Sequence, residues 1–160
     1  MGEYAVGAYL RLVEGCRLVS YDQKASEERG KGEEIDVVAL HSTNRTVFLC
    51  EVATHLGGIN YGGGNQDTLQ RLRKKFTAFR RYASEAFPDL KPRFMLWSPY
   101  VPTGTLTEGL EKMRQDTDIE PIINQEYSKR VRMLQDKART DIKDRGEPFY
   151  RALQILEHLR

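Results

Sequence analysis

The sequence has 160 residues, enough for one domain with a hydrophobic core and too few for two. Hydrophobic residues make up 39% of the chain and charged residues 30%, which excludes a chain that is disordered throughout. The formal net charge is only +2, so binding to nucleic acid must depend on local clusters of basic residues rather than on the total charge.

The cysteines and the N-terminus bear on the cellular compartment. Cys16 and Cys50 both lie in apolar, strand-like runs and have no metal-type spacing, which is typical of reduced core cysteines. The N-terminus has no signal-peptide pattern, and no apolar run approaches the ~18 residues that span a membrane. We therefore expect a cytoplasmic protein without a membrane segment.

The first third of the chain begins with a helix and a strand. Apolar residues at helical spacing predict a helix over residues 3–14, and strand-forming residues predict a short strand over 16–21. Residues 22–33 have no apolar periodicity, and we expect them to form a mobile loop. This loop leads into the most informative segment of the chain.

Residues 34–41 and 46–55 have the composition of two β-strands, and the polar residues 42–45 separate them. This pattern predicts a β-hairpin. If the four polar residues are the loop, His41 faces Thr46, and the same register places Asp36 opposite Glu51.

Opposed residues in an antiparallel pair lie on one face with Cβ atoms roughly 4.5–5.5 Å apart, so Asp36 and Glu51 are expected to repel each other. Glu34 lies two residues before Asp36 and is expected on the same face. A hard cation such as Mg²⁺ or Mn²⁺ would turn these carboxylates into a binding site. Two alternatives stay open: the carboxylates are solvated at the strand ends, or a loop one residue different puts them on opposite faces.

Residues 57–65 contain five glycines and follow the hairpin. A glycine loop before a helix is able to bind a phosphate through its backbone amides, but the lysine and hydroxyl residues of a P-loop are missing. A flexible lid or hinge beside the carboxylates is the favoured interpretation.

The clearest predicted helix covers residues 66–86 and carries one apolar stripe. Lys75 lies about 70° from the centre of this stripe, at the edge of the buried face, whereas Lys74 points to solvent. Lys75 is therefore expected either to reach inward or to cover apolar surface with its stem. The remaining basic residues are candidates for binding phosphates, or else they form a solvated face: Arg71, Arg73, Lys74, Arg80 and Arg81.

The second half of the chain alternates between strands and helices. Pro92 is expected in a turn before a buried strand over residues 93–97, and a helix is expected to start at Thr105. Residues 119–123 read as an edge strand, because Pro121 is tolerated there. Two final helices are expected, the first with Asn124 as N-cap and the second starting at Pro148.

These elements predict a single α/β domain with a mixed central sheet covered on both faces. The core is expected over about 1–123 and a helical extension over about 124–160. The extension is expected either to cap the core or to form the interface of a homodimer.

The order helix, three strands, helix, strand resembles the restriction-endonuclease-like (PD-(D/E)xK) nuclease superfamily, nearest to its Holliday-junction-resolvase-like group. The matching residues are Glu3 with the helical residues 9–10, the segment 15–19, Glu34-Ile35-Asp36 and the strand 48–52 that contains Glu51. The resemblance implies an α-β-β-β-α-β core that hydrolyses phosphodiester bonds in DNA. It also implies Asp36 and Glu51 as Mg²⁺ ligands, with Glu3 as a carboxylate near the metal.

The sequence departs from this family at one informative position. The family's lysine two residues after the glutamate would fall at position 53, where this chain has Ala53. Either a lysine from the next helix, with Lys75 as the candidate, takes its place, or the chain kept the fold and lost the chemistry. His55 and Gln66 are further polar residues expected near the site.

Three hypotheses follow. The first is a metal-dependent nuclease acting on DNA rather than RNA, with Asp36, Glu51, Lys75 and Glu34 as catalytic residues. The second is an inactive nuclease-fold protein that binds nucleic acid or serves in assembly, with the later helix adding Lys129, Arg130 and Arg132. The third is an interaction subunit that docks through its last helix.

Overall fold

A computed structural model describes residues 1–25, 32–55, 57–59 and 61–160. Half of the mobile loop expected over 22–33, residues 26–31, lies outside the described residues, and residues 22–24 belong to the first strand rather than to a loop. The elements follow the predicted order: α1 (Gly2–Leu12), β1 (Leu18–Lys24), β2 (Glu34–His41), β3 (Thr46–Val52), α2 (Asn65–Ala86), β4 (Lys91–Ser98), α3 (Thr105–Asp116), β5 (Ile119–Ile123), α4 (Asn124–Thr140) and α5 (Pro148–His158).

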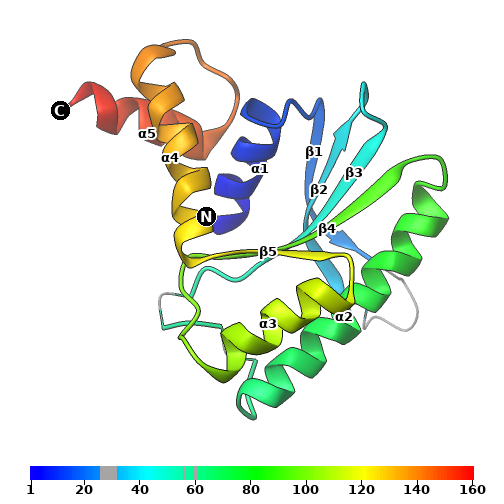
Figure 1. Cartoon of the computed structure of the whole chain (residues 1–160). Coiled ribbons are helices and arrows are strands. Elements are labelled where there is room, and N and C mark those ends of the chain that lie inside the picture. The colour runs from blue at the N-terminus through cyan, green and yellow to red at the C-terminus, as the bar shows by residue number, and fades with distance from the viewer. Residues whose placement is uncertain (26–31, 56, 60) are drawn as a thin grey trace.

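The five strands form one mixed sheet in the order β1-β2-β3-β4-β5 (Figure 1). β1, β2 and β3 are antiparallel to one another, whereas β3, β4 and β5 run parallel. The short connection between β2 and β3 explains the first arrangement, and the helical crossovers α2 and α3 explain the second. The structure therefore confirms an α/β fold with a mixed sheet, and β5 is an edge strand as predicted.

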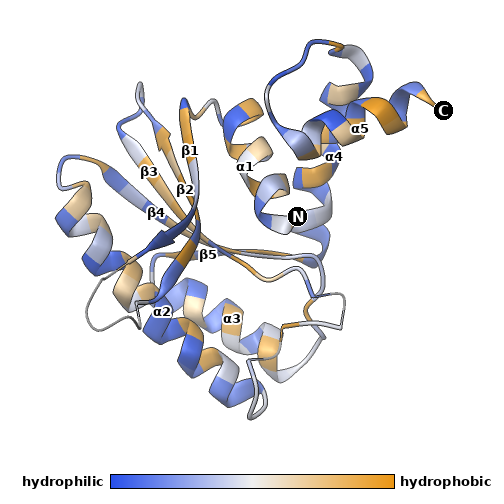
Figure 2. Ribbon diagram, turned by 180° about the vertical axis from the view of Figure 1, so that it is seen from behind, coloured by the Kyte–Doolittle hydropathy of each residue, from blue (hydrophilic) through white to orange (hydrophobic). Residues whose placement is uncertain are grey.

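Helices cover both faces of this sheet (Figure 1). α2 and α3 pack on one face, where Leu72, Phe76 and Phe79 are fully buried against strand residues that include Leu49. α1, α4 and α5 pack on the other face around Trp97. Figure 2 shows that apolar residues are concentrated in the strands, and that apolar and polar residues alternate along α2 and α3. Burial of each large apolar side chain stabilises the fold by about 1.5–3 kcal/mol.

The register of the hairpin matches the prediction. His41 pairs with Thr46, and the ladder continues to Val37 opposite Cys50. The four-residue loop closes with Arg45 at a φ of 48°. The paired ladder ends there, and Asp36 and Glu51 are the next residues on the two strands.

Three details differ from the sequence-based expectations. β1 runs over Leu18–Lys24, later than the expected 16–21. Pro92 lies within β4 rather than in a turn, and it pairs in register with Val47. Asn124 begins α4 but does not cap it, because its side chain instead bonds the backbone N–H and C=O of Val101 at 2.8 and 3.0 Å.

No helix in the described part of the chain is both long enough and apolar enough to cross a membrane.

Candidate active site

The carboxylate of Glu51 is the centre of the candidate site. Glu51 is the next-to-last residue of β3, it faces α2, and it is only 2% exposed. Lys75 of α2 donates to its Oε2 from Nζ at 2.5 Å, and the Tyr61 hydroxyl donates to its Oε1 at 2.5 Å. Both oxygens of this buried carboxylate are therefore bound. We call Asp36, Glu51, Tyr61 and Lys75 the Glu51 cluster.

Asp36 lies beside Glu51 and accepts a hydrogen bond on Oδ2 from the backbone N–H of Val52 at 2.6 Å. Burial first, and the charge of Glu51 second, raise the pKa of Asp36 to about 7, and a hydrogen bond between the two carboxyl groups adds to the rise. Two carboxyl groups form a hydrogen bond with each other only when one of them carries a proton, and a bound cation can take the place of that proton. Without a cation, Asp36 is therefore only about half ionised at neutral pH.

The position of Lys75 follows from the helical stripe of α2. Its side chain is 19% exposed, whereas that of Lys74 is 80% exposed, as their predicted angles from the apolar stripe require. Ala53 lies two residues beyond Glu51, is buried, and belongs to the same apolar cluster as the α2 stripe. The small side chain at position 53 thus lies on the sheet face from which Lys75 approaches Glu51.

The Glu51 cluster has the donor chemistry of a site for a hard divalent cation. Asp36 and Glu51 offer carboxylate oxygens, the ligands that Mg²⁺ and Mn²⁺ prefer, and a cation would take the place of the proton between them. The part of the chain that the structure describes holds no group of three or more His, Cys, Asp and Glu arranged to bind a metal. A cation held by Asp36 and Glu51 would need water or substrate oxygens to complete its coordination, as is usual for Mg²⁺.

Other candidate residues lie outside the Glu51 cluster. Glu34 is exposed at the start of β2, next to Lys24 of β1. Glu34 and Asp36 are expected on one face because side chains alternate between the two faces of a regular strand. Ile35 and Val38 are three positions apart and should therefore face opposite sides, yet both belong to the apolar cluster under α2. The alternation of side chains is therefore broken near Asp36. Glu3 forms an ion pair with the amino group of Met1 at 2.9 Å, on the helix that covers the opposite face of the sheet. His55 and Gln66 are exposed.

Tyr61 was not identified from the sequence, although it lies inside the glycine-rich segment expected beside the site. Burial first, and the charge of Glu51 next, raise the pKa of Tyr61 above its usual range, so the phenol stays protonated as a donor. The charge of Asp36 acts in the same direction. An aromatic residue within a glycine-rich segment was the signal available in the sequence.

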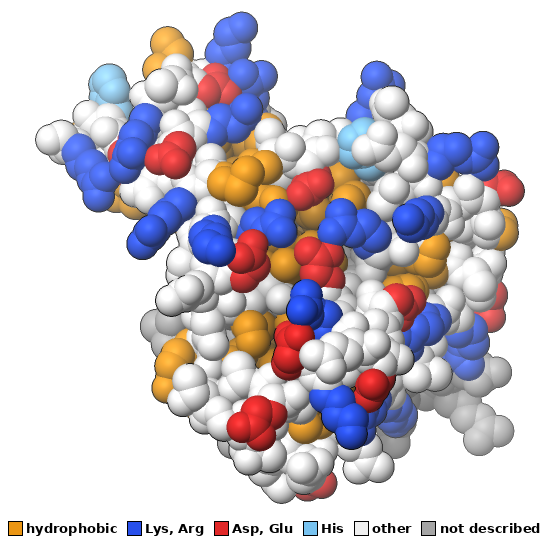
Figure 3. Space-filling view, viewed as in Figure 1, with side chains coloured by type: hydrophobic (Ala, Val, Ile, Leu, Met, Phe, Trp, Pro, Cys, Tyr) orange, Lys and Arg blue, Asp and Glu red, His pale blue; other side chains and the backbone are white. Residues whose placement is uncertain are grey.

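The basic residues of α2 differ in their environments. Arg71, Arg73 and Arg81 are exposed, and Lys74 lies 3.9 Å from Glu33. Arg80 pairs with Asp118, with its Nε 3.1 Å from Oδ1, and lies over the ring of Phe94. Figure 3 shows basic side chains interspersed with acidic ones rather than a patch of one sign on the face it displays.

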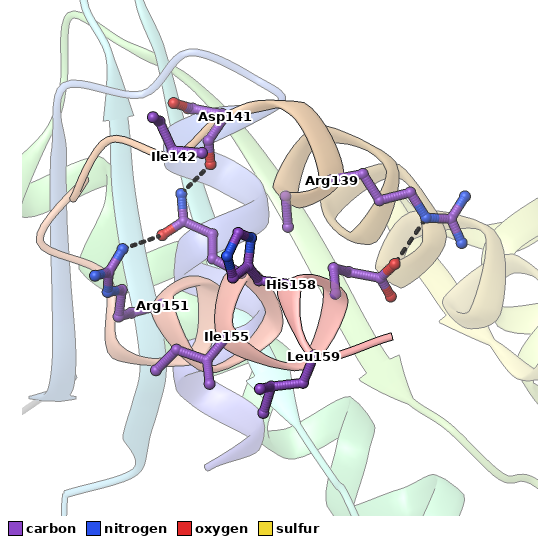
Figure 4. Close-up of a pocket in the computed structure, with 10 residues that line it drawn as sticks. Arg139, Asp141, Ile142, Arg151, Ile155, His158 and Leu159 are labelled. Atoms are coloured by element: carbon purple, nitrogen blue, oxygen red, sulfur yellow. Dashed lines mark hydrogen bonds and ion pairs between the residues drawn. The ribbon is translucent and has the colours of Figure 1, made fainter.

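A separate pocket of about 390 Å³ lies between α4 and α5 (Figure 4). The polar groups that line it bind one another: Arg139 pairs with Glu157 at 2.8 Å, and Gln154 binds Arg151 and the carbonyl of Asp141. Ile142, Ile155 and Leu159 add exposed apolar surface. This pairing within the lining is typical of a structural contact between the two helices.

Comparison of the sequence with protein-family models finds no matching family, and a search of curated proteins finds no matching sequence. The function of the chain is therefore inferred from the Glu51 cluster.

Proposed function

We propose that this protein is a metal-dependent nuclease that hydrolyses phosphodiester bonds in DNA and has the core of the restriction-endonuclease-like superfamily. The observation that carries the proposal is the contact of Lys75 with Glu51 on the face that Asp36 shares. A lysine from α2 meets the glutamate where the family's own lysine would arise from position 53. The order α1-β1-β2-β3-α2-β4 and the mixed sheet support the same assignment.

The residues of the Glu51 cluster divide the chemistry among them. Asp36 and Glu51 would hold Mg²⁺ or Mn²⁺, which supplies an activated water and offsets charge on the phosphate. Lys75 would stabilise the negative charge that develops on the phosphate in the transition state. Its ammonium group is suited to this role because the buried Glu51 carboxylate already holds it in place. The exposed arginines of α2 would bind phosphates further along the DNA backbone.

A second candidate function is an inactive nuclease-fold protein that binds nucleic acid or serves in assembly. The observation that favours it is that Lys75 and Tyr61 already occupy both oxygens of Glu51. A buried carboxylate satisfied in this way also serves as a structural ion pair without any metal.

The test is cleavage of a panel of labelled DNA and RNA substrates, including a four-way junction, with Mg²⁺ or Mn²⁺. Asp36→Asn is the diagnostic variant, because its amide oxygen still accepts the N–H of Val52 while its charge is gone. We expect metal-dependent cutting of DNA by the wild type and none by the variant, with circular dichroism showing that both are folded. Absence of cutting by a folded wild type on every substrate favours the inactive binding protein instead.

A further inference from the structure

Among the residues of the Glu51 cluster, Tyr61 has no role in the proposed chemistry. It reaches Glu51 from the segment between β3 and α2, donates to Oε1 at 2.5 Å, and is itself half-buried. We propose that Tyr61 is a positioning residue that blocks the Glu51 oxygen in the metal-free protein and must leave it before a divalent cation binds. This inference rests on the proposed metal site.

The hydrogen bond places Tyr61 in competition with a cation. Lys75 binds Oε2 of Glu51, so Oε1 is the oxygen on which Tyr61 and a metal ion would meet. The hydroxyl points its proton at this oxygen, and a divalent cation repels that proton.

The backbone after Tyr61 is built to let the ring move. Gly62, Gly63 and Gly64 have φ angles of 84°, 73° and 94°, a region that glycine enters and leaves at low cost. A Cβ on Gly64 would meet no atom within 4 Å, so packing does not hold this position, whereas a Cβ on Gly63 would clash with Oδ2 of Asp67. Gly64 therefore forms the hinge between Tyr61 and α2.

The segment is held at points on either side of this hinge. The backbone N–H of Tyr61 donates at 3.3 Å to Oγ1 of Thr68, which is buried in the first turn of α2. Gly58 packs closely against Pro102, where an added Cβ would lie 3.0 Å from the ring. The anchor at Gly58 and the start of α2 stay in place when Tyr61 swings out.

The experiment is isothermal titration of the full-length protein with Mn²⁺ at one fixed pH, which needs no substrate. Tyr61→Phe removes the hydroxyl and keeps the ring, and it is expected to bind Mn²⁺ about tenfold more tightly, the change that loss of one competing hydrogen bond to a charged group produces. Tyr82→Phe is the matched control, because Tyr82 is half-buried on α2 against Phe87, and it should bind as the wild type does. Asp36→Asn should not bind.

The outcomes separate this inference from the proposed function. If wild type binds Mn²⁺ through Asp36 and Tyr61→Phe binds equally or more weakly, the blocking role of Tyr61 is wrong and the metal site stands. If neither protein binds, or if Asp36→Asn binds as wild type does, both proposals are wrong. Tighter binding by Tyr61→Phe, or binding by that variant alone, supports the block.

Discussion

At the scale of single residues, the Glu51 cluster makes the stability of the metal-free protein depend on pH. The pKa of Asp36, about 7, lies above the ordinary 3.8 of aspartate, so the folded protein holds this proton more tightly than the unfolded chain does. The stability that the protonated group contributes is fully present below pH about 4 and is lost as the pH rises through 7. Strongly shifted pKa values such as this one are found more often at functional sites than in the packed core.

This linkage predicts that Asp36→Asn stabilises the metal-free protein. An asparagine does not ionise, so the variant avoids the loss that wild type suffers between pH 4 and pH 8. We expect a free energy of unfolding higher by about 1–2 kcal/mol at pH 8, and a difference near zero at pH 4. Thermal melts in EDTA at both pH values measure it. A variant less stable than wild type at pH 8 would show that the Asp36 charge is well satisfied.

Lys75 provides the second residue-scale prediction. Lys75→Met should lower DNA cleavage by about 10²–10³-fold, because it removes a preorganised positive charge from the site. It should also destabilise the metal-free fold by about 3 kcal/mol, since Glu51 is left buried without its partner. Lys74→Met changes the adjacent, exposed lysine and serves as the control for both measurements. Equal cleavage by the two variants would exclude Lys75 from the chemistry.

At the scale of elements, local patterns were predicted well and tertiary contacts were not. The period-two pattern of the hairpin fixed its register, and the helical stripe of α2 placed Lys75 at the edge of the buried face, because both depend on neighbours along the chain. Asn124 was wrong as an N-cap because it bonds Val101, 23 residues away. The contact of Tyr61 with Glu51 was missed for a similar reason, since a loop's path is not set by periodicity.

The break of alternation at Asp36 is a further limit on what the sequence predicts. The β1–β2 register passes from Tyr21–Val37 to Gln23–Ile35, and Asp22 between them has a φ of 55°. This irregular backbone leaves the Asp36 carboxyl to bind Val52, and it removes the expectation that Glu34 shares its face. No residue pattern in β2 signals it.

The basic face of α2 carries an element-scale prediction about DNA binding. Arg73→Gln should weaken binding to all DNA sequences and lower the slope of log affinity against log salt by about 0.9. Arg80→Gln is the matched control on the same helix, because Arg80 is already paired with Asp118 and should contribute little to binding. Fluorescence anisotropy over a salt series measures both. If the two variants show the same dependence of log affinity on log salt, the exposed basic face of α2 does not contact DNA.

At the scale of the whole molecule, the C-terminal extension belongs to the core. Tyr150 of α5 is fully buried in the cluster that contains Trp97 and Leu10 of α1. Glu147, directly before α5, is buried and pairs with Arg11 of α1 at 2.8 Å. The helices after residue 123 therefore cap the sheet face that α1 begins to cover. Their role as a homodimer interface stays a prediction, which the exposed Ile155, Leu156 and Leu159 leave open.

This packing predicts that α5 is needed for folding. Tyr150→Ala should lower the free energy of unfolding by about 3–5 kcal/mol, which shifts the melting temperature by roughly 6–20 °C in a domain of this size. Leu156→Ala removes a large apolar side chain from the same helix, but one that is 62% exposed, and should change stability by less than about 0.5 kcal/mol. Urea denaturation of both variants measures the difference. If Leu156→Ala is as damaging as Tyr150→Ala at micromolar concentration, and its stability rises with protein concentration, the exposed face of α5 is buried in a dimer.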